Sequence, residues 1–290
     1  MGKLSRLIAD PVKPVILRGE IWVSPDVLSD AGFSQGPRGL IEMATAMGAD
    51  VCFFHWPEVV MSSDLKEILM VARAAGLDCG LTVDGPFQRL AATRNLIDIL
   101  EDIARRPFAF QRRLANESEE VEEIFSFVEG AGIELILLCD DVAFTGGLYF
   151  SPEIFKEAIV PFYRRWVKRL ASSRIAPGWH SDGDVGLILP QLVDCGFRFF
   201  SLEPEGVDLL NFKRTHGSRV TLVTGIPADW FNRGTLDQDQ EKECLQVMNA
   251  LAREGGFILA SSCGLHHPKF LPVLKQIYKL SERITGSSKT

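Results

Sequence analysis

The sequence contains no long hydrophobic run and no block of basic residues. No stretch approaches the roughly 20 apolar residues that cross a bilayer, and the first residues lack an apolar run long enough for a signal peptide. Lysine and arginine are scattered and the formal net charge is −7, whereas nucleic acids and anionic lipids bind clustered cations. We therefore expect a cytoplasmic protein that binds neither nucleic acid nor membrane.

Closely spaced cysteines are also absent, which argues against a disulfide scaffold or a zinc ribbon. Cys263 ends a strand pattern and is considered below with other polar residues. The remaining five lie in strand or helix patterns and are expected to be reduced core thiols: Cys52, Cys79, Cys139, Cys195 and Cys244. No G-x-G-x-x-G follows the first strand, so the main structural alternative, a doubly wound dinucleotide-binding sheet, lacks support.

Strand-length apolar runs alternate regularly with segments of helical periodicity from residue 14 onward. This order predicts an α/β fold, a (βα)₈ TIM barrel formed as a single domain by residues 1–290. One unit is irregular: the stretch Phe87 to Gly130 must hold two helices with a break near Arg106-Pro107. The predicted strands are Val15 to Val23, Ala49 to Trp56, Asp78 to Asp84, Ile133 to Asp141, Ile175 to Asp182, Phe197 to Glu203, Arg219 to Ile226 and Phe257 to Cys263.

Polar residues collect where the predicted strands end, and barrel enzymes form their active sites there. Each has an ordinary structural explanation as well. Asp84 and Asp141 could cap helices, His55 could be a half-buried histidine, and Glu203 could pair with an arginine at the rim. The strand ends in question carry His55, Asp84, Asp140, Asp141, His180, Asp182, Glu203 and Cys263.

The combination favours a metal site. His180, Asp182, Glu203 and Cys263 follow the fifth, sixth and eighth predicted strands and should converge on one side of the barrel mouth. An imidazole, a thiolate and one or two carboxylates suit zinc, which keeps one position open in catalytic sites. Rival ligands, expected to be solvent-exposed, follow in the next loop: His266 and His267.

Long ordered segments of the chain resemble the uroporphyrinogen decarboxylase superfamily, which includes the zinc-dependent corrinoid methyltransferases. The resemblance is carried by ADVCFFHW, VDGPF, LLCDDVAFTGGLYFSPEIFKEAIVPF, WHSDGDVGLILPQLVDCGFRFFSLEP, VTGIP and GGFILASSCG. Resemblance to the decarboxylase branch would imply an arginine-rich segment near the N-terminus and an aspartate at the end of the second strand. Here that segment holds only Arg18 and the aspartate position is His55, which disfavours porphyrinogen decarboxylation.

The methyltransferase branch is similar at its zinc site, a His-x-Cys pair with a second cysteine near the C-terminus. His180 and Cys263 match this pattern, Asp182 stands at the cysteine of the pair, and Glu203 corresponds to a displaceable fourth ligand. A carboxylate in place of a thiolate leaves the metal a stronger Lewis acid, suited to polarising an ether oxygen. The resemblance therefore implies methyl transfer from a small methylated substrate, an aryl methyl ether being favoured, to a corrinoid (cobalamin) on a partner protein.

Further roles follow from this interpretation. Asp84, Asp141 and His55 are the predicted catalytic groups that orient the substrate or handle its proton. The predicted substrate contacts are Trp22, Trp56, Phe87, Phe144 and Asp140. The alternatives are a metal-free decarboxylase and a corrinoid- or substrate-binding module without catalysis. The sequence leaves the oligomeric state open, with a homodimer among the options.

Overall fold

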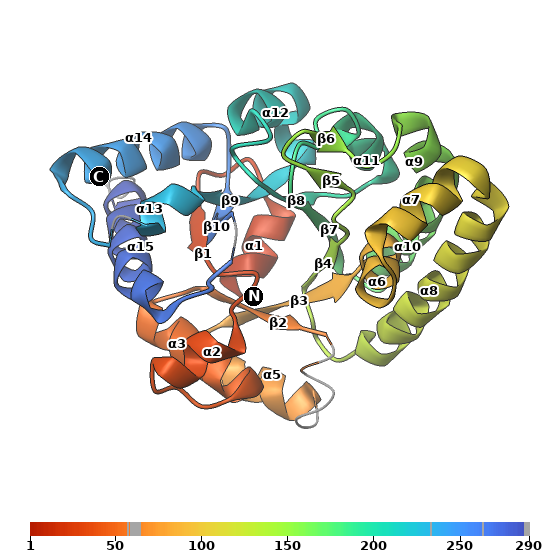
Figure 1. The fold of residues 1–290 in the computed structure, drawn as a ribbon. Coiled ribbons are helices and arrows are strands. Elements are labelled where there is room, and N and C mark those ends of the chain that lie inside the picture. Colours follow the sequence, from red (N-terminus) through yellow and green to blue (C-terminus); the bar gives the residue numbers. More distant parts are fainter. Residues whose placement is uncertain (57, 59–64, 233, 263, 287–290) are drawn as a thin grey trace.

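Eight parallel strands form a nearly closed barrel in the computed structural model, which describes residues 1–286 apart from 57, 59–64, 233 and 263 (Figure 1). The strand order is β1-β10-β9-β8-β7-β4-β3-β2. At the seam the Asp50 N–H donates to the Arg18 carbonyl oxygen at 2.8 Å. The predicted (βα)₈ barrel is thus confirmed. Its strands are β1 (Ile16–Arg18), β2 (Val51–His55), β3 (Asp78–Asp84), β4 (Leu135–Cys139), β7 (Ala176–Ser181), β8 (Phe199–Leu202), β9 (Thr221–Ile226) and β10 (Phe257–Ser261).

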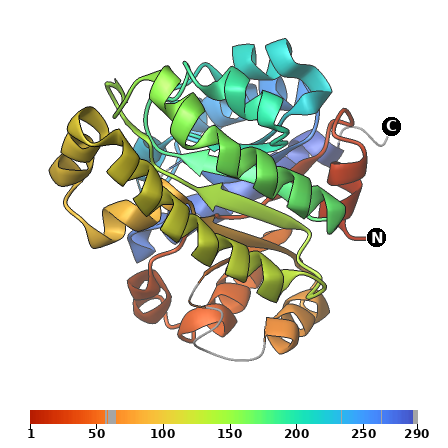
Figure 2. The ribbon, with the colours of Figure 1, turned by 90° about the vertical axis from the view of Figure 1, so that its right-hand side faces the viewer.

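Helices surround the strands and bury their apolar faces against them (Figures 1 and 2). None of the helices in the described ranges is long and apolar enough to span a membrane. The outer helices are α3 (Gly36–Met47), α5 (Leu65–Ala74), α8 (Pro107–Val128), α10 (Val160–Ser172), α11 (Leu189–Cys195), α12 (Leu209–His216), α14 (Gln238–Arg253) and α15 (Leu271–Gly286). Shorter helices are α1 (Lys3–Ala9), α2 (Pro25–Asp30), α6 (Pro86–Thr93), α7 (Leu96–Arg105), α9 (Pro152–Ala158) and α13 (Ala228–Asn232), with 3₁₀ turns at Gly217–Arg219 and Pro268–Phe270.

Two apolar clusters form the core, one between strands and helices and one inside the barrel. The inner cluster includes Leu4 and Leu7 of α1, which closes the barrel at the amino ends of the strands. Gly178 of β7 is part of this packing, because a Cβ there would lie 2.3 Å from a methyl group of Leu137. The closed bottom leaves the opposite end, at the strands' carboxyl termini, open for a site.

The irregular segment after β3 holds three helices instead of the predicted two: α6, α7 and α8. The expected break at Arg106-Pro107 is confirmed, and it separates α7 from α8. A second break falls before α7, where the Asn95 side chain accepts a hydrogen bond from the Ile97 N–H at 2.8 Å and caps the helix. Asparagine at this position satisfies an otherwise unpaired amide, so the helix restarts there.

A small antiparallel hairpin, absent from the prediction, stands at the carboxyl rim between β4 and α9. It consists of β5 (Ala143–Phe144) and β6 (Gly147–Leu148), and Gly147 adopts a positive φ of 124° at the turn. The Phe144 carbonyl oxygen accepts a hydrogen bond from the Asp184 N–H at 3.0 Å. The hairpin is thereby held against the loop that follows β7.

Candidate metal centre and substrate pocket

A pocket of about 440 Å³ opens at the carboxyl ends of the strands. It brings together seven residues that the sequence analysis had singled out: Trp22, His55, Asp84, Asp141, His180, Asp182 and His266. Other described residues complete its wall: Ile21, Thr82, Gln88, Cys139, Ser262 and Gly264. A volume of this size lies in the range of small-molecule sites.

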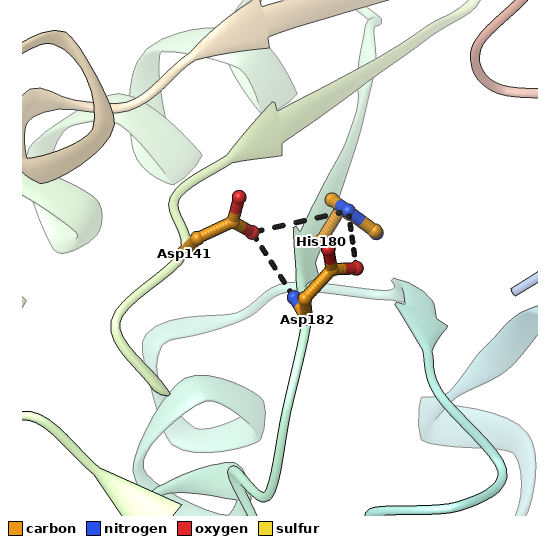
Figure 3. Close-up of side chains that lie close together, drawn as sticks. All are labelled: Asp141, His180 and Asp182. Atoms are coloured by element: carbon orange, nitrogen blue, oxygen red, sulfur yellow. Dashed lines mark hydrogen bonds and ion pairs between the residues drawn. The ribbon is translucent and has the colours of Figure 1, made fainter. Parts of the chain in front are cut away.

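Three side chains in this pocket form a potential metal-binding group. The ligand atoms of Asp141, His180 and Asp182 all lie within 4.8 Å of one another. His180 Nε2 is 3.5 Å from an Asp182 oxygen and 4.0 Å from an Asp141 oxygen. Figure 3 shows the three side chains turned toward one another. Nitrogen and carboxylate donors in this arrangement suit a divalent ion such as zinc.

The loop after β7 takes its shape from a glycine and two carboxylates. Gly183 adopts a φ of 81°, and a Cβ there would lie 2.6 Å from the backbone of Phe144. Its N–H donates to Glu203 at 2.8 Å, and the Asp182 N–H donates to Asp141 at 3.0 Å. Glu203 therefore supports the turn that presents Asp182, whereas Asp141 belongs to the candidate metal-binding group itself.

The orientation of His180 is fixed by the neighbouring strand. Its Nδ1 lies 3.0 Å from the hydroxyl of Ser201, which is buried in β8. This contact occupies one ring nitrogen and leaves Nε2 directed at the two carboxylates. A hydrogen bond at the far nitrogen is the usual support of a metal-binding histidine.

Electrostatic repulsion among carboxylates marks the pocket. Burial, followed by the charges of Asp141 and Glu203, raises the pKa of Asp182 to about 6 against the opposing effect of His180. Burial likewise raises the pKa of Asp84. His55 and Arg89 oppose this rise, and the charge of Asp141 adds to it. A bound cation would relieve this repulsion because it pairs with the charged forms of these groups.

Asp140 is fully buried and faces away from this group. It accepts hydrogen bonds from the Tyr163 hydroxyl at 2.5 Å and from the Gln88 N–H at 2.7 Å. Tyr163 in turn accepts a bond from the Trp179 indole N–H at 3.1 Å. Burial raises the pKa of Asp140 to about 7 despite these donors. In the structure Asp140 thus ties β4 to α10 and to the start of α6, and it is not among the residues that line the pocket.

The four predicted aromatic contacts lie in different places. Trp22 lines the pocket, with its ring centroid 4.8 Å from that of His266. Phe87 is buried in the core beside Tyr149 and Phe150, and the Trp56 ring packs against Phe127 of α8. Phe144 is 51% exposed on the rim hairpin. Trp22 alone among these four contributes to the described wall of the pocket.

The expectation that Cys139 is a core thiol is wrong, because its side chain lines the pocket. Burial and the nearby Asp84 raise the pKa of this thiol far above its usual value. The strand register explains its position: Cys139 pairs with Asp84 on one side and His180 on the other, and His180 pairs with Ser201. Paired residues on neighbouring strands point the same way, which a single sequence does not reveal.

Cys263 and His267 are the remaining predicted ligand positions. Cys263, the expected zinc-binding thiolate, lies outside the described residues. His267 is exposed, and its Nδ1 accepts a hydrogen bond from the Lys269 N–H at 3.1 Å. Ser262, a position that was not predicted, is buried in the wall, and its hydroxyl has no hydrogen-bond partner among the described residues.

Comparison with known proteins agrees with the geometry. The profile of the uroporphyrinogen decarboxylase (URO-D) family matches residues 73–276. A methylcobamide:CoM methyltransferase, MtaA, from Methanosarcina barkeri is 25% identical over 205 residues, which is 69% of this chain and 57% of the relative. MtaA from the Fusaro strain is 24% identical over the same length. The chain thus matches little more than half the length of these relatives.

Solved structures agree on the fold. A methyltransferase from Methanosarcina mazei superimposes with a TM-score of 0.73 at 15% identity, covering 97% of both chains. An L-ribulose 3-epimerase reaches a TM-score of 0.58 at 11% identity, covering 95% of this chain and 99% of that one. At these identities the similarity extends to the barrel architecture alone.

Proposed function

The chain belongs to the uroporphyrinogen decarboxylase family, and from this premise we propose that it is a zinc-dependent methyltransferase. In this proposal it takes a methyl group from a small methylated substrate and delivers it to a corrinoid carried by a partner protein. The relatives named methylcobamide:CoM methyltransferase support the reaction class. The observation that carries the proposal is the group formed by Asp141, His180 and Asp182 in the pocket.

The described donors fit zinc. His180 offers its Nε2 while its other ring nitrogen is already engaged by Ser201, and Asp182 offers a carboxylate 3.5 Å away. With Cys263 these two would hold the ion, and Asp141 lies within reach as a further ligand. Zinc bound there would supply a Lewis acid that polarises the bond to the departing methyl group.

The donor set favours one direction of transfer. MtaA is named for transfer from methylcobamide to coenzyme M, a thiol. Here Asp182 stands where the resembling enzymes carry a cysteine, and a carboxylate donates less electron density than a thiolate. A more electrophilic site suits the weakening of a carbon–oxygen bond better than the activation of a thiol. We therefore favour transfer from an ether donor to the corrinoid.

The remaining wall of the pocket suits an aryl methyl ether. Trp22 and His266 provide an aromatic surface on which a ring can stack. His55, held by a 2.9 Å contact between its Nδ1 and the Thr82 hydroxyl, and Asp84 lie on other strands of the same pocket. These two groups can orient the donor and hold a proton for the departing phenolate oxygen.

The same wall argues against a porphyrinogen substrate. Three aspartates line it, Asp84, Asp141 and Asp182, and no arginine or lysine occurs among its described lining residues. A ligand with eight carboxylates would be repelled by these charges. Decarboxylation of such a ligand remains the alternative that the experiment below must exclude.

The test replaces the ligands one at a time. We expect His180→Ala and Cys263→Ala each to lose most bound zinc and nearly all methyl transfer while keeping the fold, since a site with three protein ligands binds weakly once one is removed. Zinc is measured by elemental analysis and methyl transfer by the absorbance of a reduced corrinoid mixed with an aryl methyl ether. His267→Ala is the matched control and should keep both. A parent protein purified without chelators that holds no zinc, or that releases CO₂ from a porphyrinogen, contradicts the proposal.

A substitution that restores a thiolate tests the direction. Asp182→Cys should retain zinc, because a thiolate is a better ligand, yet transfer from the ether should slow as the metal becomes less electrophilic. In the same variant, methyl transfer from a methylated corrinoid to a thiol, measured in parallel, should keep the rate of the parent. Equal slowing of both directions would show that the choice between thiolate and carboxylate does not set the preferred donor.

A further inference from the structure

We propose that the outer face of α8 joins two copies of this chain in an antiparallel, two-fold symmetric dimer. Helix α8 has 22 residues, which corresponds to a length of about 33 Å. In Figure 2 it crosses the face of the molecule that is turned toward the viewer. Its buried side packs on the barrel, and residues at helical spacing form an exposed stripe on the other side: Phe108, Arg112, Asn116, Glu119, Glu123 and Phe127.

The stripe carries its two signs of charge at opposite ends. Arg112 lies in the first half of the helix, and Glu119 and Glu123 lie in the second. Within the described part of the chain none of these three side chains takes part in an ion pair. An antiparallel copy would bring the positive half of one helix against the negative half of the other, so the charges complement each other.

The positions along the stripe are symmetric about the middle of the helix, between residues 117 and 118. Phe108 and Phe127 are equally distant from this point, and so are Arg112 and Glu123. A two-fold axis through it would place Arg112 opposite the partner's Glu123. It would likewise place Phe108 opposite the partner's Phe127. Each contact then occurs twice, as in any two-fold interface.

The ends of the stripe are apolar and one of them has a receiving cavity. Phe108 is 86% exposed and Phe127 is 54% exposed, values that are unusual for phenylalanine in a soluble domain. Beside Phe127 lies a groove of about 580 Å³ in which Trp56 and Ile124 provide apolar surface and Arg89, Glu120 and Glu123 provide a charged edge. In the dimer the partner's Phe108 would enter this groove, and aromatic anchors in pockets contribute most of the binding energy of protein interfaces.

Charge reversal on the intact chain tests the arrangement. Arg112→Glu and Glu123→Arg each replace two attractions with two repulsions, and we expect each to raise the dimer Kd about tenfold. The double variant Arg112→Glu/Glu123→Arg restores opposite signs and should return the Kd close to that of the parent. Phe108→Ser should weaken the dimer independently of charge. Arg253→Glu, the same charge change on the exposed surface of α14, should have no effect.

The measurement is sedimentation velocity over a series of protein concentrations, with far-ultraviolet circular dichroism to show that each variant folds. It needs neither metal nor substrate, so its outcome is independent of the proposed methyl transfer. A parent that stays monomeric throughout, or single variants that dimerise like the parent, would overturn the proposal. A double variant whose dimer Kd is as high as that of the single variants would also overturn it. A monomer whose stripe variants lose binding to a corrinoid protein would assign the stripe to that partner instead.

Discussion

Ser201 should control zinc affinity without touching the metal. Its hydroxyl lies 3.0 Å from His180 Nδ1 and is buried, so Ser201→Ala removes a contact that water does not readily replace. The loss of one such bond costs about 1 to 1.5 kcal/mol, and removal of a group that supports a metal-binding histidine lowers affinity roughly 10- to 100-fold. Because 1.4 kcal/mol corresponds to a factor of ten, the first estimate predicts a zinc Kd raised about 5- to 12-fold, and the second overlaps it at about tenfold.

The assay is a competition titration against a chromophoric zinc chelator at constant pH. Ser118→Ala provides the matched control: Ser118 is also fully buried, but its hydroxyl donates to the Leu114 carbonyl oxygen within α8. Its zinc Kd should equal that of the parent. If the two serine variants bind zinc equally well, His180 is not a ligand or is oriented by other groups, and the reasoning about the site is refuted.

Other substitutions probe the surroundings of the site. Burial raises the pKa of Asp140 to about 7, so the folded state takes up a proton between about pH 4 and pH 7 that the unfolded state lacks, and stability falls as the pH rises through this window. Asp140→Asn should remove this loss, which is on the order of 4 kcal/mol. The check is the free energy of unfolding in urea, measured with chelator present at both ends of the window. If parent and variant lose the same stability between the two pH values, the prediction is contradicted. Gly183→Ala should lower zinc affinity and thermal stability together, because its Cβ would meet the Phe144 backbone at 2.6 Å; calorimetry showing an unaltered melting temperature would count against this. Glu203→Gln should reduce zinc affinity less than His180→Ala, since an amide oxygen can still accept the Gly183 N–H; a larger loss in titration would make Glu203 a ligand.

The barrel and the location of its site could be predicted because both depend on local pattern. Alternation of strand-length apolar runs with helical periodicity reflects burial of each element on its neighbours, and burial is the main force in folding. Polar residues after such runs emerge at one end of a parallel barrel by geometry alone. His55, Asp84, Asp141, His180 and Asp182 therefore line a single pocket, as expected from their positions after successive strands.

The direction of each side chain decides which of these residues faces the pocket and which is buried in the fold. Asp140 and Asp141 are adjacent in sequence, yet one is buried against Tyr163 and the other faces His180. Neighbouring residues at a strand end point to opposite sides, and sequence pattern does not say which side holds the site. For the same reason Trp56, directly after His55, packs against α8 and not in the pocket.

The sequence by itself determined the alternation of strands with helices, the barrel and the strand ends at which a site could form. Only the tertiary structure decided that Ser201 supports His180, that Glu203 holds the turn at Gly183, and that Cys139 lines the pocket. These contacts join residues on different strands, and their partners follow from strand register and loop conformation, which arise from the packing of the whole barrel and not from local pattern.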